Sequence, residues 1–172
     1  KPAPPAEVKP KYGGVYTIPI TAEPTDFDEA YFPSYLSYTP SLTNEELLIG
    51  DWTKGPAGTG EADWKVTAFF GHLAVGSLAE SVESPNPQTL IFHIRKGVYW
   101  HNKPPVNGRE FVAEDVKWTL ERILASTWGN RGLFEPIDTI ECPDKYTVKL
   151  TTREPFAPML MMLTDPMSMI IC

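Results

Sequence analysis

The chain has 172 residues, 42% of them hydrophobic, which suffices for one globular domain with a buried core. Its net charge of −7 argues against binding to nucleic acid or to an anionic membrane, because those surfaces need basic patches that neutralise phosphate. No apolar run is long enough to span a membrane, and the most hydrophobic tract, 159–163, is soon followed by Asp165-Pro166.

The N-terminal residues predict an extended spacer followed by a strand. Residues 1–12 are rich in proline and lack the apolar core of a targeting segment, so they indicate a stiff spacer. Gly13-Gly14 ends it, and the β-branched and aromatic residues 15–18 favour a strand. Proline and aspartate then predict a loop at 21–28, directly before the aromatic segment 31–35.

Residues 44–61 are less clearly patterned. Periodicity does not decide whether 44–49 form a short helix or a strand. The glycine-rich stretch 50–61 predicts an exposed loop, flanked by Trp52 and Trp64. This loop has two interpretations, a specificity or partner element and a tolerated surface insertion, since long surface loops carry little entropic penalty.

The strongest pattern lies at 90–124. Apolar residues alternate over 90–95, which predicts a strand with one face in the core, and Lys96-Gly97 permits a tight turn. An aromatic run at 98–100 and a turn-rich loop at 102–108 lead to a predicted helix at 113–124. One apolar stripe of this helix holds Val116, Leu120, Ile123 and Leu124. We expect Phe92 of the strand to share a core with Val116, Leu120 and Ile123.

The C-terminal third predicts short elements. Residues 128–134 form a second aromatic loop with two glycines, and 137–141 and 146–151 alternate as a hairpin with its turn at 142–145. A short apolar helix at 157–163 and a closing strand at 167–171 follow. The five methionines between 159 and 169 fit either a soft-metal site or adaptable core filler, and the surrounding leucines and isoleucines favour the core.

The sequence contains no recognisable catalytic motif. His72, His93 and His101 include no pair at helical spacing, and no phosphate-binding loop follows a strand. We therefore expect no enzyme activity, no metal site and no cofactor. Cys142 and Cys172 are compatible with a disulfide in an oxidising compartment, but we expect free thiols.

Three motifs in one order, SLAES (77–81), FHIRKGVYWH (92–101) and NGREFVAEDVKWTLERI (107–123), closely resemble the signature of family 5 extracellular solute-binding proteins, the peptide and nickel receptors of bacterial ABC importers. The resemblance runs from about Gly13 to the end of the chain. Val112 stands where the family usually has a threonine helix cap, although Asp115 could still reach back to the Val112 N–H.

The resemblance implies a mixed α+β fold, a partial lobe I of the type II periplasmic-binding-protein kind, with residues 13–172 as its N-terminal part and the second lobe absent. It places ligand-contacting residues in the two aromatic loops, where the candidates are Glu23, Phe32, Tyr35, Trp128 and Asn130.

As function, the resemblance implies an extracytoplasmic receptor, often lipid-anchored behind such a spacer, that closes two lobes around a solute and delivers it to a membrane permease. Peptides are the favoured solute, with nickel chelates and oligosaccharides open, and we expect a monomer. The alternative from another class is a stand-alone surface interaction module that uses the Trp52 and Trp128 loops.

Overall fold

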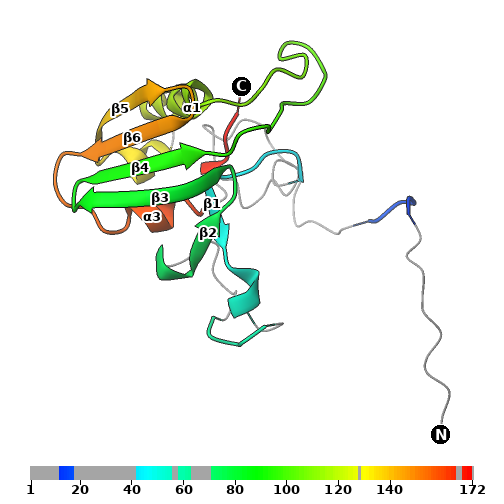
Figure 1. Ribbon diagram of the computed structural model, residues 1–172, viewed down its shortest axis with the longest axis horizontal. Helices are drawn as coiled ribbons and strands as arrows, with labels where there is room; N and C mark the ends of the chain where they lie inside the picture. The colour runs from blue at the N-terminus through cyan, green and yellow to red at the C-terminus, as the bar shows by residue number, and fades with distance from the viewer. Residues whose placement is uncertain are drawn as a thin grey trace, which may run out of the picture.

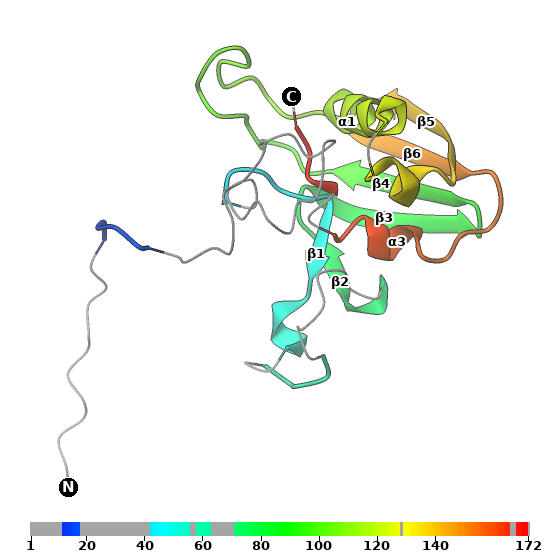
Figure 2. The ribbon, with the colours of Figure 1, turned by 180° about the vertical axis from the view of Figure 1, so that it is seen from behind.

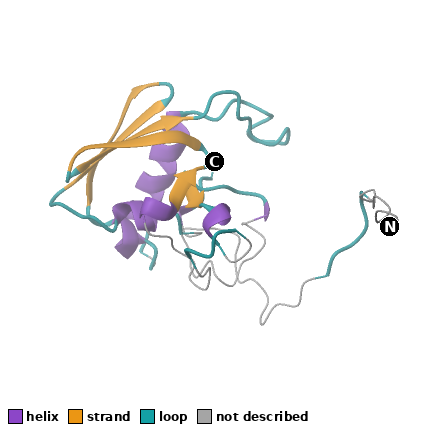
Figure 3. Ribbon diagram, turned by 60° about the horizontal axis from the view of Figure 1, so that its bottom comes forward, coloured by secondary structure: helices purple, strands orange, loops and turns teal. Residues whose placement is uncertain are grey.

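The computed structural model describes residues 12–17, 42–55, 58–62, 71–127, 129–165 and 168–171. A four-stranded antiparallel sheet has the order β3-β4-β6-β5 (Figure 1). Its strands are β3 (Ala79–Asn86), β4 (Thr89–Ile94), β5 (Ile137–Asp144) and β6 (Thr147–Thr152). The helices are α1 (Ala113–Ala125), α2 (Arg131–Phe134) and α3 (Met159–Met162). They lie on one side of this sheet (Figure 3), which gives the predicted mixed α+β fold.

A second, two-stranded sheet pairs β1 (Leu48–Gly50) with β2 (Ala74–Gly76). It lies beside the main sheet, and the chain between its strands begins with the 3₁₀ turn Trp52–Lys54 (Figure 2). A further 3₁₀ turn, Gly71–Leu73, precedes β2. The ambiguous segment 44–49 therefore ends in a strand, and the described part of the 50–61 loop contains one turn of helix.

The core lies between the main sheet and α1, as the sequence predicts. Phe92 of β4 and Val116, Leu120 and Ile123 of α1 are all fully buried in one hydrophobic cluster. The other face of the sheet is polar: His93 Nε2 lies 3.0 Å from Glu83 Oε1, and Lys149 Nζ lies 2.7 Å from Glu141 Oε2. Such exposed pairs stabilise a fold only weakly, so the helix-covered face carries most of the packing energy.

The predicted hairpin is confirmed, but its turn is shorter than expected. β5 continues through Pro143 to Asp144, so only Lys145 and Tyr146 form the turn. The Asp144 carboxylate accepts the Tyr146 N–H at 2.8 Å, which closes the turn locally. Pro143 falls inside a register shift of the β5–β6 ladder, where its missing N–H is tolerated.

Four other expectations are corrected. Residues 15–17 form no strand, and Val15 and Tyr16 are almost fully exposed; Ile18 lies outside the described residues. The predicted closing strand is absent from 168–171, where Met169 and Ile170 are buried without sheet pairing. The helix predicted at 157–163 is shorter, and the described part of the 128–134 loop contains α2. In the first three cases a local pattern was apolar enough for a regular element, but the described residues supply no continuous partner. In the fourth case residues 131–134 form one helical turn, which buries Phe134 in the core.

Within the described ranges, no helix has the length and apolar character needed to cross a bilayer.

Candidate functional site

A pocket of about 60 Å³ lies where three distant parts of the chain meet. Its walls are formed by Thr43, Asn44, Glu45, Leu78, Val98, Tyr99, Trp100, His101, Phe111 and Ile170. Two hydrogen bonds bring the early and late segments together: the Ile170 N–H donates to Glu45 O at 2.9 Å, and Asn44 Nδ2 donates to Ile170 O at 3.1 Å. The pocket is therefore a product of tertiary structure.

The size of this pocket limits what it can hold. Pockets that enclose a whole small-molecule ligand typically measure several hundred cubic ångströms. A volume of about 60 Å³ accommodates water or a small chemical group. The pocket therefore lacks room for a complete solute.

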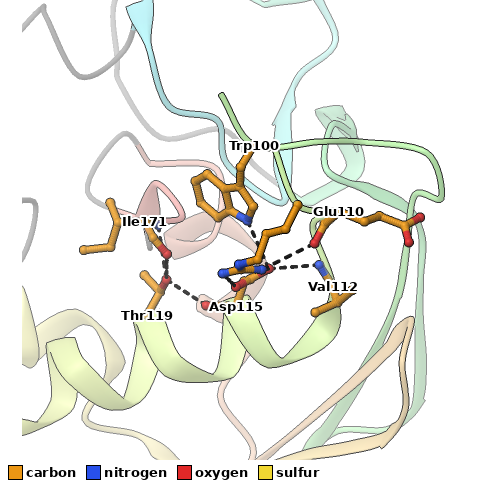
Figure 4. A network of polar contacts seen from close by, with 7 residues as sticks. Trp100, Glu110, Val112, Asp115, Thr119 and Ile171 are labelled. Atoms are coloured by element: carbon orange, nitrogen blue, oxygen red, sulfur yellow. Dashed lines mark hydrogen bonds and ion pairs between the residues drawn. The ribbon is translucent and has the colours of Figure 1, made fainter. Parts of the chain in front are cut away.

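One wall of the pocket is held by the carboxylate of Asp115, in the first turn of α1 (Figure 4). Oδ2 accepts from Trp100 Nε1 at 3.1 Å, from Arg109 Nη1 at 2.9 Å and from the Val112 N–H at 3.0 Å. Arg109 Nη2 donates to Oδ1. Burial raises the pKa of Asp115, but the hydrogen bonds from Arg109, Val112 and Trp100 outweigh it and hold this pKa below its ordinary value.

The bond between Asp115 and the Val112 N–H is the reach-back cap that the sequence suggests. It compensates for the missing threonine hydroxyl at Val112.

A second polar anchor lies one turn further along α1. The buried Thr119 hydroxyl lies 2.8 Å from Asp115 O and 3.0 Å from Ile171 O, and it accepts the Ile171 N–H at 3.2 Å (Figure 4). This contact fixes the C-terminal segment against the helix, next to the pocket residue Ile170.

Glu110 forms a third cluster with the β5–β6 turn. Its carboxylate accepts from Lys145 Nζ at 2.7 Å, from the Gly97 N–H at 3.2 Å and from the Tyr146 hydroxyl at 3.0 Å. Hydrogen bonds from Lys145, then Gly97 and Tyr146, lower the pKa of Glu110. Hydrogen bonds of Lys145 to Glu110 and then to Tyr146 raise the pKa of Lys145. The chain on both sides of the 101–109 loop is thus fastened to the body.

The five predicted ligand-contacting residues are mostly not placed by the structure. Glu23, Phe32, Tyr35 and Trp128 lie outside the described residues. Asn130 is described: it immediately precedes α2, and only 1% of its surface is exposed. The five residues stay a prediction, and the structure neither brings them together nor separates them.

Trp100 and His101 line the pocket, although neither was predicted from the sequence as a site residue. Their signal was the aromatic run 98–100, which by itself indicates only an apolar surface. In the described part of the chain, no three His, Cys, Asp or Glu side chains are arranged to hold a metal ion. Met159 and Met169 are buried, which fits the interpretation as core filler.

Comparison with known proteins gives one family. The sequence profile of "Bacterial extracellular solute-binding proteins, family 5 Middle" matches residues 74–171, more than half of the chain. Di/tripeptide-binding protein 1 of Pseudomonas aeruginosa is 35% identical over 114 residues, covering 56% of this chain and 21% of that protein. The probable D,D-dipeptide-binding periplasmic protein DdpA of Escherichia coli is 27% identical over 151 residues, covering 87% of this chain and 26% of that protein.

Solved structures agree. The periplasmic binding protein DppA of Helicobacter pylori, in complex with the peptide STSA, matches with a TM-score of 0.65 and 26% identity over 85% of this chain and 28% of that one. NikZ of Campylobacter jejuni, in complex with Ni(L-His), matches with a TM-score of 0.64 but only 21% identity, over 87% of this chain and 26% of that one. The chain thus spans about a quarter of the length of the proteins it resembles.

Proposed function

The chain belongs to the bacterial extracellular solute-binding proteins of family 5, and on that premise we propose that it is the N-terminal part of lobe I of a peptide receptor. The complete protein would close two lobes around a peptide outside the cytoplasm and deliver it to the permease of an ABC importer. The family is one of transporter receptors, and in this proposal the protein catalyses no reaction.

One observation carries the choice of peptide as the solute. The curated relatives are named for dipeptides or tripeptides, and the DppA structure at 26% identity contains a tetrapeptide. Other solved structures contain other solutes, Ni(L-His) at 21% identity and agropinic acid at 28%, so the solved structures support the fold and the curated relatives carry the choice of ligand. Short peptides are therefore the solute class that the sequence similarity favours.

The ligand site in this proposal lies at a cleft between the lobes. Glu23, Phe32, Tyr35, Trp128 and Asn130 would form one wall of it, and residues beyond this chain would form the other. The size of the pocket beside Trp100 supports this division, because that pocket is too small to enclose a peptide.

Native mass spectrometry of the full-length protein, as purified, tests the proposal. We expect a retained mass that peptide sequencing identifies as a peptide of a few residues. Calorimetry with dipeptides and tripeptides on the stripped protein should then give micromolar affinity or better. Retention of a nickel chelate or an oligosaccharide instead, with no heat of binding from any peptide, would contradict the proposed solute and leave the proposed receptor function in place.

A further inference from the structure

The loop between β4 and α1 projects from the body of the molecule (Figures 1 and 3). We call residues 101–109 the arm. Trp100 and Phe111, on either side of it, pack in or against the hydrophobic core, whereas no residue of the arm belongs to that cluster. The arm therefore adds no side chain to the hydrophobic core.

The arm is nevertheless internally ordered. The Trp100 N–H donates to Arg109 O at 3.0 Å and closes its neck. Above the neck, the N–H groups of Lys103 and Gly108 both donate to His101 O, at 2.8 and 3.1 Å, and the Asn107 N–H donates to Lys103 O at 2.8 Å. Asn107 and Gly108 both adopt positive φ, at 50° and 71°, which a turn built from Asn-Gly supports.

Hydrogen bonds and ion pairs hold the base of the arm against the body on both sides. Arg109 and Trp100 share the buried carboxylate of Asp115 (Figure 4). Glu110 binds Lys145 and Tyr146. The loop is thus ordered when the protein folds, so folding and not binding provides the free energy for ordering it. A loop fixed in advance loses little conformational entropy when it binds, so it is suited to recognition.

The charge of the arm is opposite to that of the chain. The segment HNKPPVNGR contains Lys103 and Arg109 and no acidic residue, in a chain of net charge −7. Arg109 is paired with Asp115, so Lys103 supplies the cationic group of the exposed tip, next to Pro104-Pro105. Tyr99, which is 65% exposed, adds an aromatic surface at the neck.

We propose that the arm is a docking element that inserts into an acidic depression on the outer surface of the importer's permease. This proposal rests on the proposed function. A convex, preordered loop fits a concave partner surface, whereas a solute site must enclose its ligand. An anionic membrane is a weaker fit, because attachment to it needs a cluster of several basic residues and the tip of the arm has one lysine.

The test compares permease binding with solute binding in the same proteins. The full-length receptor carries Lys103→Glu, or Lys149→Glu on the open face of the sheet as a matched charge reversal. Each protein is titrated onto the permease complex in nanodiscs at low and at high salt, and its peptide affinity is measured by calorimetry. We expect Lys103→Glu to weaken permease binding about fivefold to tenfold at low salt and to reduce its salt dependence. Peptide affinity should stay within about twofold of wild type for both variants, and Lys149→Glu should bind the permease like wild type.

Three results would overturn the arm proposal and leave the proposed transport function standing. Equal permease binding by wild type and Lys103→Glu would show that the arm makes no contact. A loss of peptide affinity with permease binding intact would place the arm at the solute site. A change in sedimentation of Lys103→Glu alone would assign the arm to self-association. A fourth result, a wild-type receptor that binds peptide but no permease, would overturn the proposed transport function together with the arm proposal. In the first three results the wild type does bind the permease, so the two failures are distinguishable.

Discussion

Asp115 connects three separate pieces of chain through one carboxylate. Its oxygens bind the pocket residue Trp100, the arm residue Arg109 and the start of α1 at Val112. Only 7% of Asp115 is exposed, so these partners replace the water that the charge loses on folding. A carboxylate in this position stabilises the fold because its partners are already in place.

Replacing Asp115 by Asn should lower the free energy of unfolding by about 1–3 kcal/mol at pH 7, since charged hydrogen bonds to Arg109 are lost. The pKa of Asp115 is lowered in the folded state, so its stabilising effect is complete above its unfolded pKa of about 3.9. That effect disappears as the pH falls through the lower, folded pKa.

Urea denaturation of wild type and Asp115→Asn at pH 7 and below pH 3 measures both effects. The difference between the two proteins should shrink in acid. Glu121→Gln is the control, because Glu121 is an exposed residue on the same helix, 3.9 Å from Lys117, and it should change stability by less than about 0.5 kcal/mol. If the stability advantage of wild type over Asp115→Asn instead grew in acid, the ionised carboxylate of Asp115 would oppose folding.

Cys142 is a free thiol on β5, half-buried, and burial raises its pKa to about 11. Because the thiolate is the reactive form, Cys142 should react with iodoacetamide at pH 8 far more slowly than an ordinary exposed thiol, and at the ordinary rate after denaturation. Mass spectrometry under non-reducing conditions measures this. A Cys142→Ser variant separates the reaction of Cys172, which the structure does not describe. No labelling of Cys142 even after denaturation would indicate a disulfide and contradict our expectation.

At the scale of elements, α1 is the helix on which the fold depends. Its buried face contributes Val116, Leu120 and Ile123 to the core, and its polar positions Asp115 and Thr119 fasten the arm and the C-terminal segment. One helix thus packs the sheet and positions both segments beside the pocket.

Truncating Leu120 to Ala should therefore cost about 2–5 kcal/mol of unfolding free energy, the range for a buried leucine. Leu120 is fully buried, so the truncation leaves an apolar cavity that water cannot fill without a cost in free energy. Chemical denaturation measures the cost, and Glu121→Ala, next to it on the exposed face, should change stability by less than about 0.5 kcal/mol. A loss below about 0.5 kcal/mol for Leu120→Ala would mean that the helix face is not packed as described.

The packing of each element decides whether it could be predicted from the sequence. β4 and α1 each have one buried face, so their apolar residues recur with the period of the element. β3 was not predicted, because it is an edge strand in which only Ala79 is buried and polar residues dominate. Residues 15–17 have strand-forming side chains, but a strand also needs a partner, and the described residues provide none.

The pocket could not be predicted for a different reason. Its walls come from residues 43–45, 78, 98–101, 111 and 170, and no local pattern connects segments so far apart in sequence. The motif resemblance did predict the family, because three motifs in a fixed order carry information that a single spacing does not.

At the scale of the whole molecule, the chain corresponds to about a quarter of each relative. In the proposed two-lobed receptor it therefore contributes one wall of the solute site. One wall leaves much of a bound peptide in water, whereas a small-molecule site usually buries about 70% or more of its ligand. Polar contacts to an open wall also lack the low dielectric that strengthens them after closure.

We therefore expect this chain alone to bind peptides no more tightly than about millimolar, while the full-length protein binds its own peptide at about micromolar or better, a difference of at least about 4 kcal/mol. Calorimetry on both proteins with one peptide, identified by native mass spectrometry of the full-length protein, measures the difference. Circular dichroism of the short chain should first show that its sheet and α1 are folded, so that weak binding reports a missing wall and not unfolding. Equal affinities would mean that one lobe suffices, which contradicts capture between two lobes and favours a stand-alone interaction module.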